Sequence, residues 1–124
     1  MIIDELAIYL ENQEYGEKGT DIFIDTFPET ATNCIVIYTT GGFPPRVDIN
    51  HDETTYQFMV RNSSYSTGQT KINNIKNEFH NKTLTLDTST VYGKATSDIG
   101  YLGKDEGNYH RFVINFSFKH RRSS

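Results

Sequence analysis

The stretch Arg111-Phe112-Val113-Ile114-Asn115-Phe116-Ser117-Phe118 decides the fold, because every second residue in it is large and apolar. Successive side chains of a β-strand point to opposite faces, so these apolar residues share one face. Three phenylalanines and an isoleucine on a single face predict a strand that faces the core. The two predicted faces are His110, Phe112, Ile114, Phe116, Phe118 and His120 on one side, and Tyr109, Arg111, Val113, Asn115, Ser117 and Lys119 on the other.

The residues before this strand predict its partner. The chain runs from Val91 through Tyr101-Leu102-Gly103 and then reaches Lys104-Asp105-Glu106-Gly107, a polar segment with a glycine that is typical of a turn. We therefore predict one long β-hairpin that closes the chain.

The composition indicates a globular protein with an acidic balance. The chain has 124 residues, which is a common size for one domain, and eight Phe and eight Tyr supply bulk for a core. The formal net charge of -4 argues against a general nucleic-acid binder, since such proteins neutralise phosphates. We expect a single domain over 1–124. Its short basic tail, 119–124, is expected to be solvated or to dock a partner.

The rest of the chain predicts two helices and three further strands. Apolar residues at helical spacing predict a short helix over 2–10. Extended segments over 20–27, 33–39 and 55–61 predict three strands, the third antiparallel to the second. The predicted fold class is α+β. It is a mostly antiparallel sheet of about five strands with an N-terminal helix and one amphipathic helix packed on it, closing with a long C-terminal β-hairpin.

The amphipathic helix is predicted from a capping box at Ser66-Thr67-Gly68-Gln69, in which Ser66 caps the first amides and Gln69 reaches back. We expect this helix to run to about Asn81. Its apolar face is predicted to carry Tyr65, Ile72, Ile75 and Phe79.

A long polar connection is predicted between the second and third strands, from the breaker at Gly41-Gly42 to Thr54. Loops of this length often bind partners. His51-Asp52-Glu53 places three possible metal ligands in a row, but adjacent residues rarely converge on one ion. We therefore expect no metal site here. Because the sequence also offers no set of nucleophile, base and metal ligands, we expect no cofactor, no catalytic residue and no enzyme activity. The candidate partner-docking loop comprises Phe43, Arg46, Asp48, Asp52 and Glu53.

Cys34 is the one cysteine and lies in the apolar run Cys34-Ile35-Val36-Ile37-Tyr38. We expect a buried structural thiol and no intrachain disulfide. The N-terminus lacks the pattern of a signal peptide, and no apolar stretch is long enough to cross a bilayer. The protein is therefore expected to stay in a cytoplasm or to be packaged there, without membrane contact.

Tyrosines on the predicted strands leave a second class of function open, which is a sheet-based binding module for a peptide or a single-stranded nucleic acid. Stacking of bases would also need a basic groove beside the rings, and the charge balance argues against one. The tyrosines in question are Tyr38, Tyr56, Tyr92, Tyr101 and Tyr109.

The order of elements resembles the tail terminator proteins of long-tailed bacteriophages, a group that includes sequences labelled minor capsid protein. The resemblance rests on the N-terminal helix and the extended segment before Pro28. It also rests on the strand Tyr56-Gln57-Phe58-Met59-Val60-Arg61, which leads directly into a helix, and on the closing hairpin. It covers nearly the whole chain.

The resemblance implies a structural virion protein that forms a homo-oligomeric ring, usually of six, at the head-proximal end of the tail tube. Such a ring stops tube polymerisation and presents a head–tail joining surface. The implied partners are the tail tube protein and the head-completion (stopper) protein, with DNA passing through the lumen without specific binding. The implied locations are the virion tail and, during assembly, the host cytoplasm.

A cyclic ring needs contacts in which one patch of a subunit meets a different patch of its neighbour. The closing hairpin offers the first candidates, because its polar face and its turn are not required by the core. The candidate subunit-contact residues are Tyr101, Lys104, Asp105, Glu106, Tyr109, Arg111 and Val113.

Overall fold

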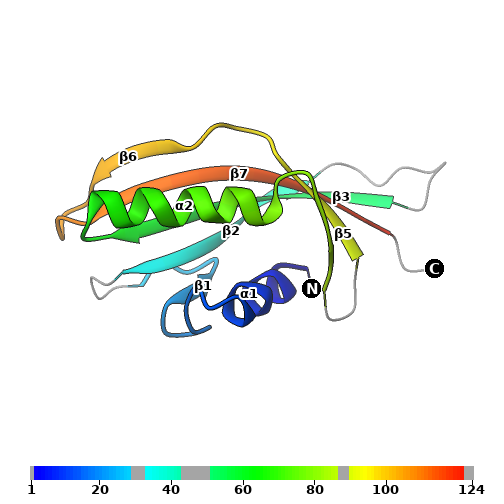
Figure 1. The fold of residues 1–124 in the computed structure, drawn as a ribbon, viewed down its shortest axis with the longest axis horizontal. Helices are drawn as coiled ribbons and strands as arrows, with labels where there is room; N and C mark the ends of the chain where they lie inside the picture. Colours follow the sequence, from blue (N-terminus) through cyan, green and yellow to red (C-terminus); the bar gives the residue numbers. More distant parts are fainter. Residues whose placement is uncertain (1, 29–32, 43–50, 87–89, 122–124) are drawn as a thin grey trace.

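The computed structural model describes residues 2–28, 33–42, 51–86 and 90–121 (Figure 1). Within these residues the chain forms two helices and seven strands. In chain order they are α1 (Ile2–Asn12), β1 (Ile22–Ile24), β2 (Cys34–Gly42), β3 (His51–Asn62), α2 (Tyr65–Phe79), β4 (Lys82–Thr85), β5 (Thr90–Ala95), β6 (Gly100–Lys104) and β7 (His110–Arg121).

All the strands belong to one sheet with the order β1-β2-β3-β7-β5-β4, and β6 also pairs with β7. Every pairing is antiparallel except that of β1 with β2, which is parallel. The predicted α+β class, with its mostly antiparallel sheet, is confirmed. The sheet has two strands more than predicted, because β4 is a strand of its own and the outgoing arm of the hairpin is split in two.

The pairing of β3 with β7 forms the long axis of the molecule (Figure 1). Twelve residues of each strand pair without a register shift, from His51 opposite Arg121 to Asn62 opposite His110. This register places Phe58 directly opposite Ile114, and both side chains are fully buried. The core face predicted for the last strand is confirmed, since Phe112, Ile114, Phe116 and Phe118 are all buried.

Both helices pack against the same face of the sheet and share one apolar core with it. Leu6 and Leu10 of α1 are fully buried, as is Phe79 of α2. The ring of Phe79 lies 5.3 Å from that of Phe58 and 5.6 Å from that of Tyr9, centroid to centroid, so it joins the two helices to the sheet. Full burial of one such side chain contributes roughly 1.5–3 kcal/mol.

The start of α2 differs from the prediction. Ser64, not Ser66, is the N-cap, because its hydroxyl accepts the amide of Thr67 at 3.3 Å. The chain leaves β3 at Asn62, whose side chain accepts the amide of Ser64, so the helix begins earlier than the capping-box pattern indicates. Tyr65, predicted to face the core, lies in the first turn and is 44% exposed. Ile72, Ile75 and Phe79 are buried as predicted.

Gly68 allows α2 to lie close to β7. A Cβ atom at this position would come within 2.7 Å of the Phe112 ring. The capping-box interpretation gave Gly68 no role, whereas the structure shows that the helix–sheet distance depends on it.

The predicted closing hairpin is confirmed, with a break in its outgoing arm. β5 pairs with the second half of β7 and β6 with the first half. Between them, the amide of Thr96 still donates to the Asn115 carbonyl at 2.9 Å, and the chain then leaves the ladder. The Ser97 hydroxyl accepts the amide of Asn115 at 3.0 Å. A side chain thus replaces the backbone partner that a continuous strand would provide.

Two further boundaries differ from prediction. The strand predicted over 20–27 is limited to β1, because Asp25 adopts φ 51 and turns the chain. The connection predicted up to Thr54 ends earlier, since β3 begins at His51. Asp52 and Glu53 therefore lie on a strand, paired with His120 and Lys119.

Candidate subunit-contact surface

The predicted contact residues lie at one end of the sheet, around the turn between β6 and β7, but they do not form one surface (Figure 1). Tyr101 pairs with Phe112 and shares the helix-side face of the sheet. Arg111 and Val113 point to the opposite face, which we call the open face because neither helix packs on it.

On the helix side, Tyr101 belongs to an aromatic cluster that joins β6 to the start of α2. Its ring centroid lies 5.2 Å from that of Tyr65 and 5.1 Å from that of Phe112. Its hydroxyl is hydrogen-bonded to Nδ1 of His110 at 2.7 Å. Tyr101 is nevertheless 46% exposed, so this cluster presents a partly apolar surface to solvent.

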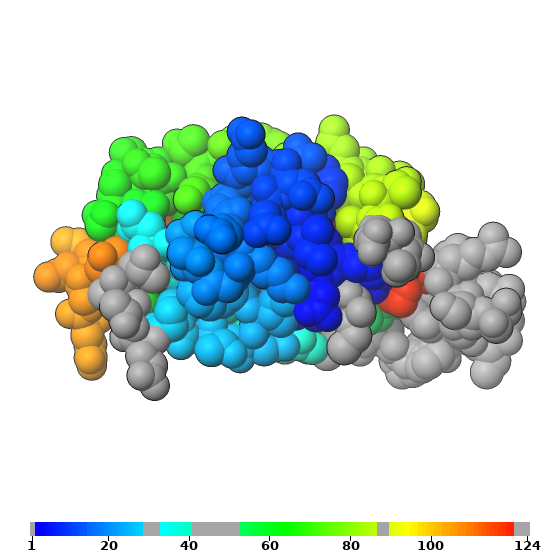
Figure 2. Space-filling view, turned by 90° about the horizontal axis from the view of Figure 1, so that it is seen from below, coloured from blue at the N-terminus to red at the C-terminus, as the bar shows by residue number. Residues whose placement is uncertain are grey.

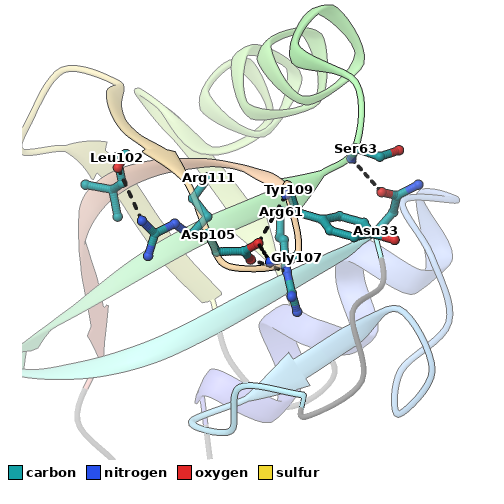
Figure 3. A network of polar contacts seen from close by, with 8 residues as sticks. All are labelled: Asn33, Arg61, Ser63, Leu102, Asp105, Gly107, Tyr109 and Arg111. Carbon is teal, nitrogen blue, oxygen red and sulfur yellow. Dashed lines mark hydrogen bonds and ion pairs between the residues drawn. The ribbon is translucent and has the colours of Figure 1, made fainter.

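Leu102 next to it was missed by the sequence analysis. The register of β6 shifts between Tyr101 and Gly103, which leaves Leu102 as a bulge with 51% of its surface exposed. Its carbonyl accepts a hydrogen bond from Nη2 of Arg111 at 3.3 Å (Figure 3). The glycine at 103, with φ +87, is the signal that could have indicated a bulge here.

On the open face, the turn is held by Arg61 of β3 (Figure 3). Nε of Arg61 lies 2.7 Å from Oδ2 of Asp105, as an ion pair without the alignment of a hydrogen bond. Two aromatic rings contact the guanidinium: its Cζ lies 4.6 Å from the Phe27 centroid and 4.9 Å from that of Tyr109. Arg61 is only 5% exposed, and the sequence analysis had given it no partner.

Asp105 organises the turn as well as pairing with Arg61. Its Oδ1 accepts the amides of Gly107 at 2.9 Å and Tyr109 at 3.1 Å. Burial raises the pKa of the Asp105 carboxyl, but these two amides and the Arg61 guanidinium together outweigh burial, so the pKa is lowered from its ordinary value. At neutral pH this group is therefore a carboxylate in the folded chain.

Arg61 and Arg111 lie directly opposite each other on β3 and β7. Like charges in this position repel, so a carboxylate beside them stabilises the sheet. Of the predicted contact residues, Asp105 and Tyr109 are thus engaged within the subunit. Lys104 and Glu106 are exposed at the turn and remain available to a partner.

Val113 belongs to a small apolar cluster on the open face. It packs, half-buried, against the buried residues Cys34, Val36 and Met59. The expectation of a buried thiol is confirmed for Cys34. Burial raises the pKa of this thiol, which makes it a poor nucleophile at neutral pH.

The residues of the predicted docking loop are only partly within the described structure. Phe43, Arg46 and Asp48 lie outside it, and Asp52 lies on β3. Glu53 is half-buried, and its Oε2 accepts the Ser117 hydroxyl at 2.6 Å. Glu53 is therefore part of the open face of the sheet.

The strand tyrosines are divided between the two faces of the sheet. Tyr56 is buried in the core and Tyr101 lies on the helix side, whereas the register places Tyr38 and Tyr92 on the open face, where Tyr109 packs on Arg61. Within residues 2–28, 33–42, 51–86 and 90–121, no group of three metal-ligating side chains is close enough to hold an ion. Over the same residues, neither helix has the length and apolar character needed to cross a membrane.

Comparison with known families identifies the chain. A family model described as "Bacteriophage tail terminator protein" matches residues 9–121. The chain belongs to this family. Tail terminators are structural proteins of the phage virion, so the resemblance noted from the order of elements is confirmed. No curated protein sequence matches the chain at a significant level.

Proposed function

We propose that this tail terminator forms a homo-oligomeric ring at the head-proximal end of the tail tube, with six as the expected number of subunits. The ring stops tube polymerisation and provides the surface on which the head-completion protein docks. The family match over residues 9–121 carries the proposal. The exposed Tyr101 and Leu102 on β6 support it, because they offer apolar surface for a neighbouring subunit.

The direct test is to disrupt the gene for this chain in its phage and to supply the chain in trans. Without the chain we expect tails of abnormal length that do not join heads, because nothing stops polymerisation of the tail tube protein. Electron microscopy of lysates measures tail length and the fraction of joined particles. Tails of normal length on infectious particles without the chain would exclude a terminator function.

A biochemical test uses the purified chain and purified tail tubes of the same phage. We expect rings at one end of each tube in negative-stain images, and no further growth when tube protein is added. Tubes that continue to grow from both ends would contradict the proposal.

The docking role of the loop remains part of this proposal. Charge reversal at Asp48 and Asp52 is expected to leave folding intact, because it changes polar positions that the core does not require. The variant rings should still cap tubes but should fail to join heads. Normal joining and infectivity in this variant would remove the loop from the docking surface.

A further inference from the structure

Aromatic rings gather at the surface where β6 meets the start of α2. Tyr65 and Tyr101 contact each other edge to face, with ring centroids 5.2 Å apart, and the His110 ring lies 5.5 Å from that of Tyr65. Tyr65 is 44% exposed and Tyr101 is 46% exposed, so both rings are accessible to a partner. Phe112, buried next to them, contacts both tyrosine rings and holds them in place. We call Tyr65, Tyr101 and His110 the aromatic patch.

The patch has the chemistry that binds proline-containing segments. Exposed aromatic rings pack against proline rings, and a segment with successive prolines favours the extended polyproline II conformation, so it loses little conformational entropy on docking. Packing of this kind does not depend on charge. We therefore expect the occupant of the patch to be an apolar segment that contains proline.

The chain itself contains one such segment. Phe43-Pro44-Pro45 is the only stretch of the sequence with adjacent prolines, and it belongs to 43–50, which lies outside the described residues. The other two internal segments outside the described residues, 29–32 and 87–89, contain no large apolar residue. A copy of this chain therefore supplies an occupant of the expected chemistry.

The segment cannot reach the aromatic patch of its own subunit. It leaves β2 at Gly42, which pairs with Thr54. The patch lies toward the other end of the sheet, where Tyr101 is opposite Phe112 and Phe112 is opposite Val60 (Figure 1). From Thr54 to Val60, β3 advances about 20 Å, to which the distance across the strands is added. The third residue beyond Gly42 reaches at most about 11 Å from it. The segment of this chain that meets the patch must therefore come from another copy.

We propose that Phe43-Pro44-Pro45 of one copy docks on the aromatic patch of the next copy of the same chain. This inference rests on the proposed ring and names the two elements that meet in it. The segment and the patch lie toward opposite ends of β3, so one patch of a subunit meets a different patch of its neighbour, which is the kind of contact that closes into a ring. The acidic residues of the same loop stay available for the head-docking role proposed above.

The direct test is binding of the isolated segment to the full chain. A peptide of residues 41–47 carries a fluorophore at its N-terminus, and fluorescence anisotropy measures its binding as the chain is added. The chain carries Phe43→Ser/Pro44→Ser/Pro45→Ser, which we call the loop variant, so that no loop of its own competes for the patch. We expect saturable binding of the peptide. A peptide with the same three substitutions should not bind.

Variants of the patch show where the peptide binds. Tyr65→Ser and Tyr101→Ser, each added to the loop variant, should weaken peptide binding about tenfold or more, because each removes an exposed ring. Tyr101→Phe keeps the ring and loses only the hydrogen bond to His110, so it should bind the peptide as the loop variant does. Tyr92→Ser is the matched control, since Tyr92 is 39% exposed on the open face. Circular dichroism checks that each variant folds.

A mixture of two variants tests the contact between whole chains. The loop variant keeps an intact patch, and Tyr101→Ser in the otherwise natural chain keeps an intact segment. Sedimentation velocity should show a 1:1 heterodimer in the mixture that grows no further, although neither variant associates alone. A symmetric contact, in which the same patch meets itself, would not give this result.

Three outcomes overturn the inference: a natural peptide that binds no better than the substituted one, peptide binding that Tyr65→Ser and Tyr101→Ser leave at the level of the control, or a mixture without a heterodimer. The proposed function is judged separately, by tail length after gene disruption. Abnormal tails without peptide binding would mean that the chain is a terminator whose subunits meet elsewhere. Normal tails together with patch-dependent binding would instead mean that the contact serves another assembly.

Discussion

The two faces of β7 have opposite chemistry over the same stretch of chain. On the helix side, Phe112, Ile114, Phe116 and Phe118 are all buried in one core. On the open face, Arg111 and Val113 alternate with them. Arg111 lies opposite Arg61, which pairs with Asp105, and Val113 packs in the small apolar cluster of the open face. The helix side fixes the fold, whereas the open face fixes where the β6–β7 turn lies. Substitutions on the two faces should therefore differ in kind as well as in size.

The largest effect is expected on the helix side. Phe116→Asp should prevent folding, because it places an unpaired charge among the rings of Phe58, Phe79 and Phe118, whose centroids lie within 5.8 Å of that of Phe116. Circular dichroism and gel filtration measure the loss of structure. Lys119→Asp, on the exposed open face of the same strand, is the control and should fold normally. A folded Phe116→Asp variant would contradict the burial of Phe116 in the core.

The second-largest loss of stability is expected on the open face, from the ion pair between Arg61 and Asp105. Arg61→Met is expected to destabilise the fold by about 3 kcal/mol, because it leaves the carboxylate of Asp105 largely buried without its partner. Urea denaturation measures the change in the free energy of unfolding. The double variant Arg61→Met/Asp105→Asn should lose less than Arg61→Met alone, since no unpaired charge remains. Equal losses in the two variants would show that Asp105 and Arg61 do not interact.

A smaller effect should appear in the pH dependence of stability. The pKa of Asp105 is lower in the folded chain than its ordinary value of 3.8, so its stabilising contribution is complete above that value. The contribution is lost as the pH falls through the folded-state pKa. The difference in unfolding free energy between the wild type and Asp105→Asn should therefore shrink in acid. A difference that is constant from neutral pH to about pH 2 would contradict the ion pair.

The smallest effect concerns the helix cap. Ser64→Ala should cost about 1 kcal/mol, because the Thr67 amide loses its acceptor. Ser66→Ala is the matched control two residues away and should change the free energy of unfolding little. Thermal denaturation of both variants measures the difference. A larger loss of stability in Ser66→Ala than in Ser64→Ala would instead support the predicted capping box, with Ser66 as the N-cap.

The helix-side face could be predicted from the sequence because its signal is local. Alternation of period two in 111–118 is enough to place the three phenylalanines on one face. Ser64 was missed as the N-cap because Ser66, two residues later, also fits the capping pattern. The sequence does not show where the chain leaves β3. The side chain of Asn62 accepts the Ser64 amide and thereby fixes the position of Ser64 at the start of the helix.

The open face could not be predicted to the same degree, because its contacts join distant parts of the chain. Arg61 meets Asp105, and the ring of Phe27 covers it from the other end of the sequence. Nothing in the local pattern around Arg61 indicates either partner. The bulge at Leu102 was likewise missed, since its exposure follows from a register shift against β7.

The split arm of the hairpin has a practical consequence for labelling. β5 and β6 each take their register from β7, and between them the chain leaves the ladder after Thr96. Additional residues inserted after Asp98, which is exposed, would lengthen only this bridge and leave both registers unchanged. A short peptide tag or a fluorophore attached there would report on assembled particles while the core strands stay in place.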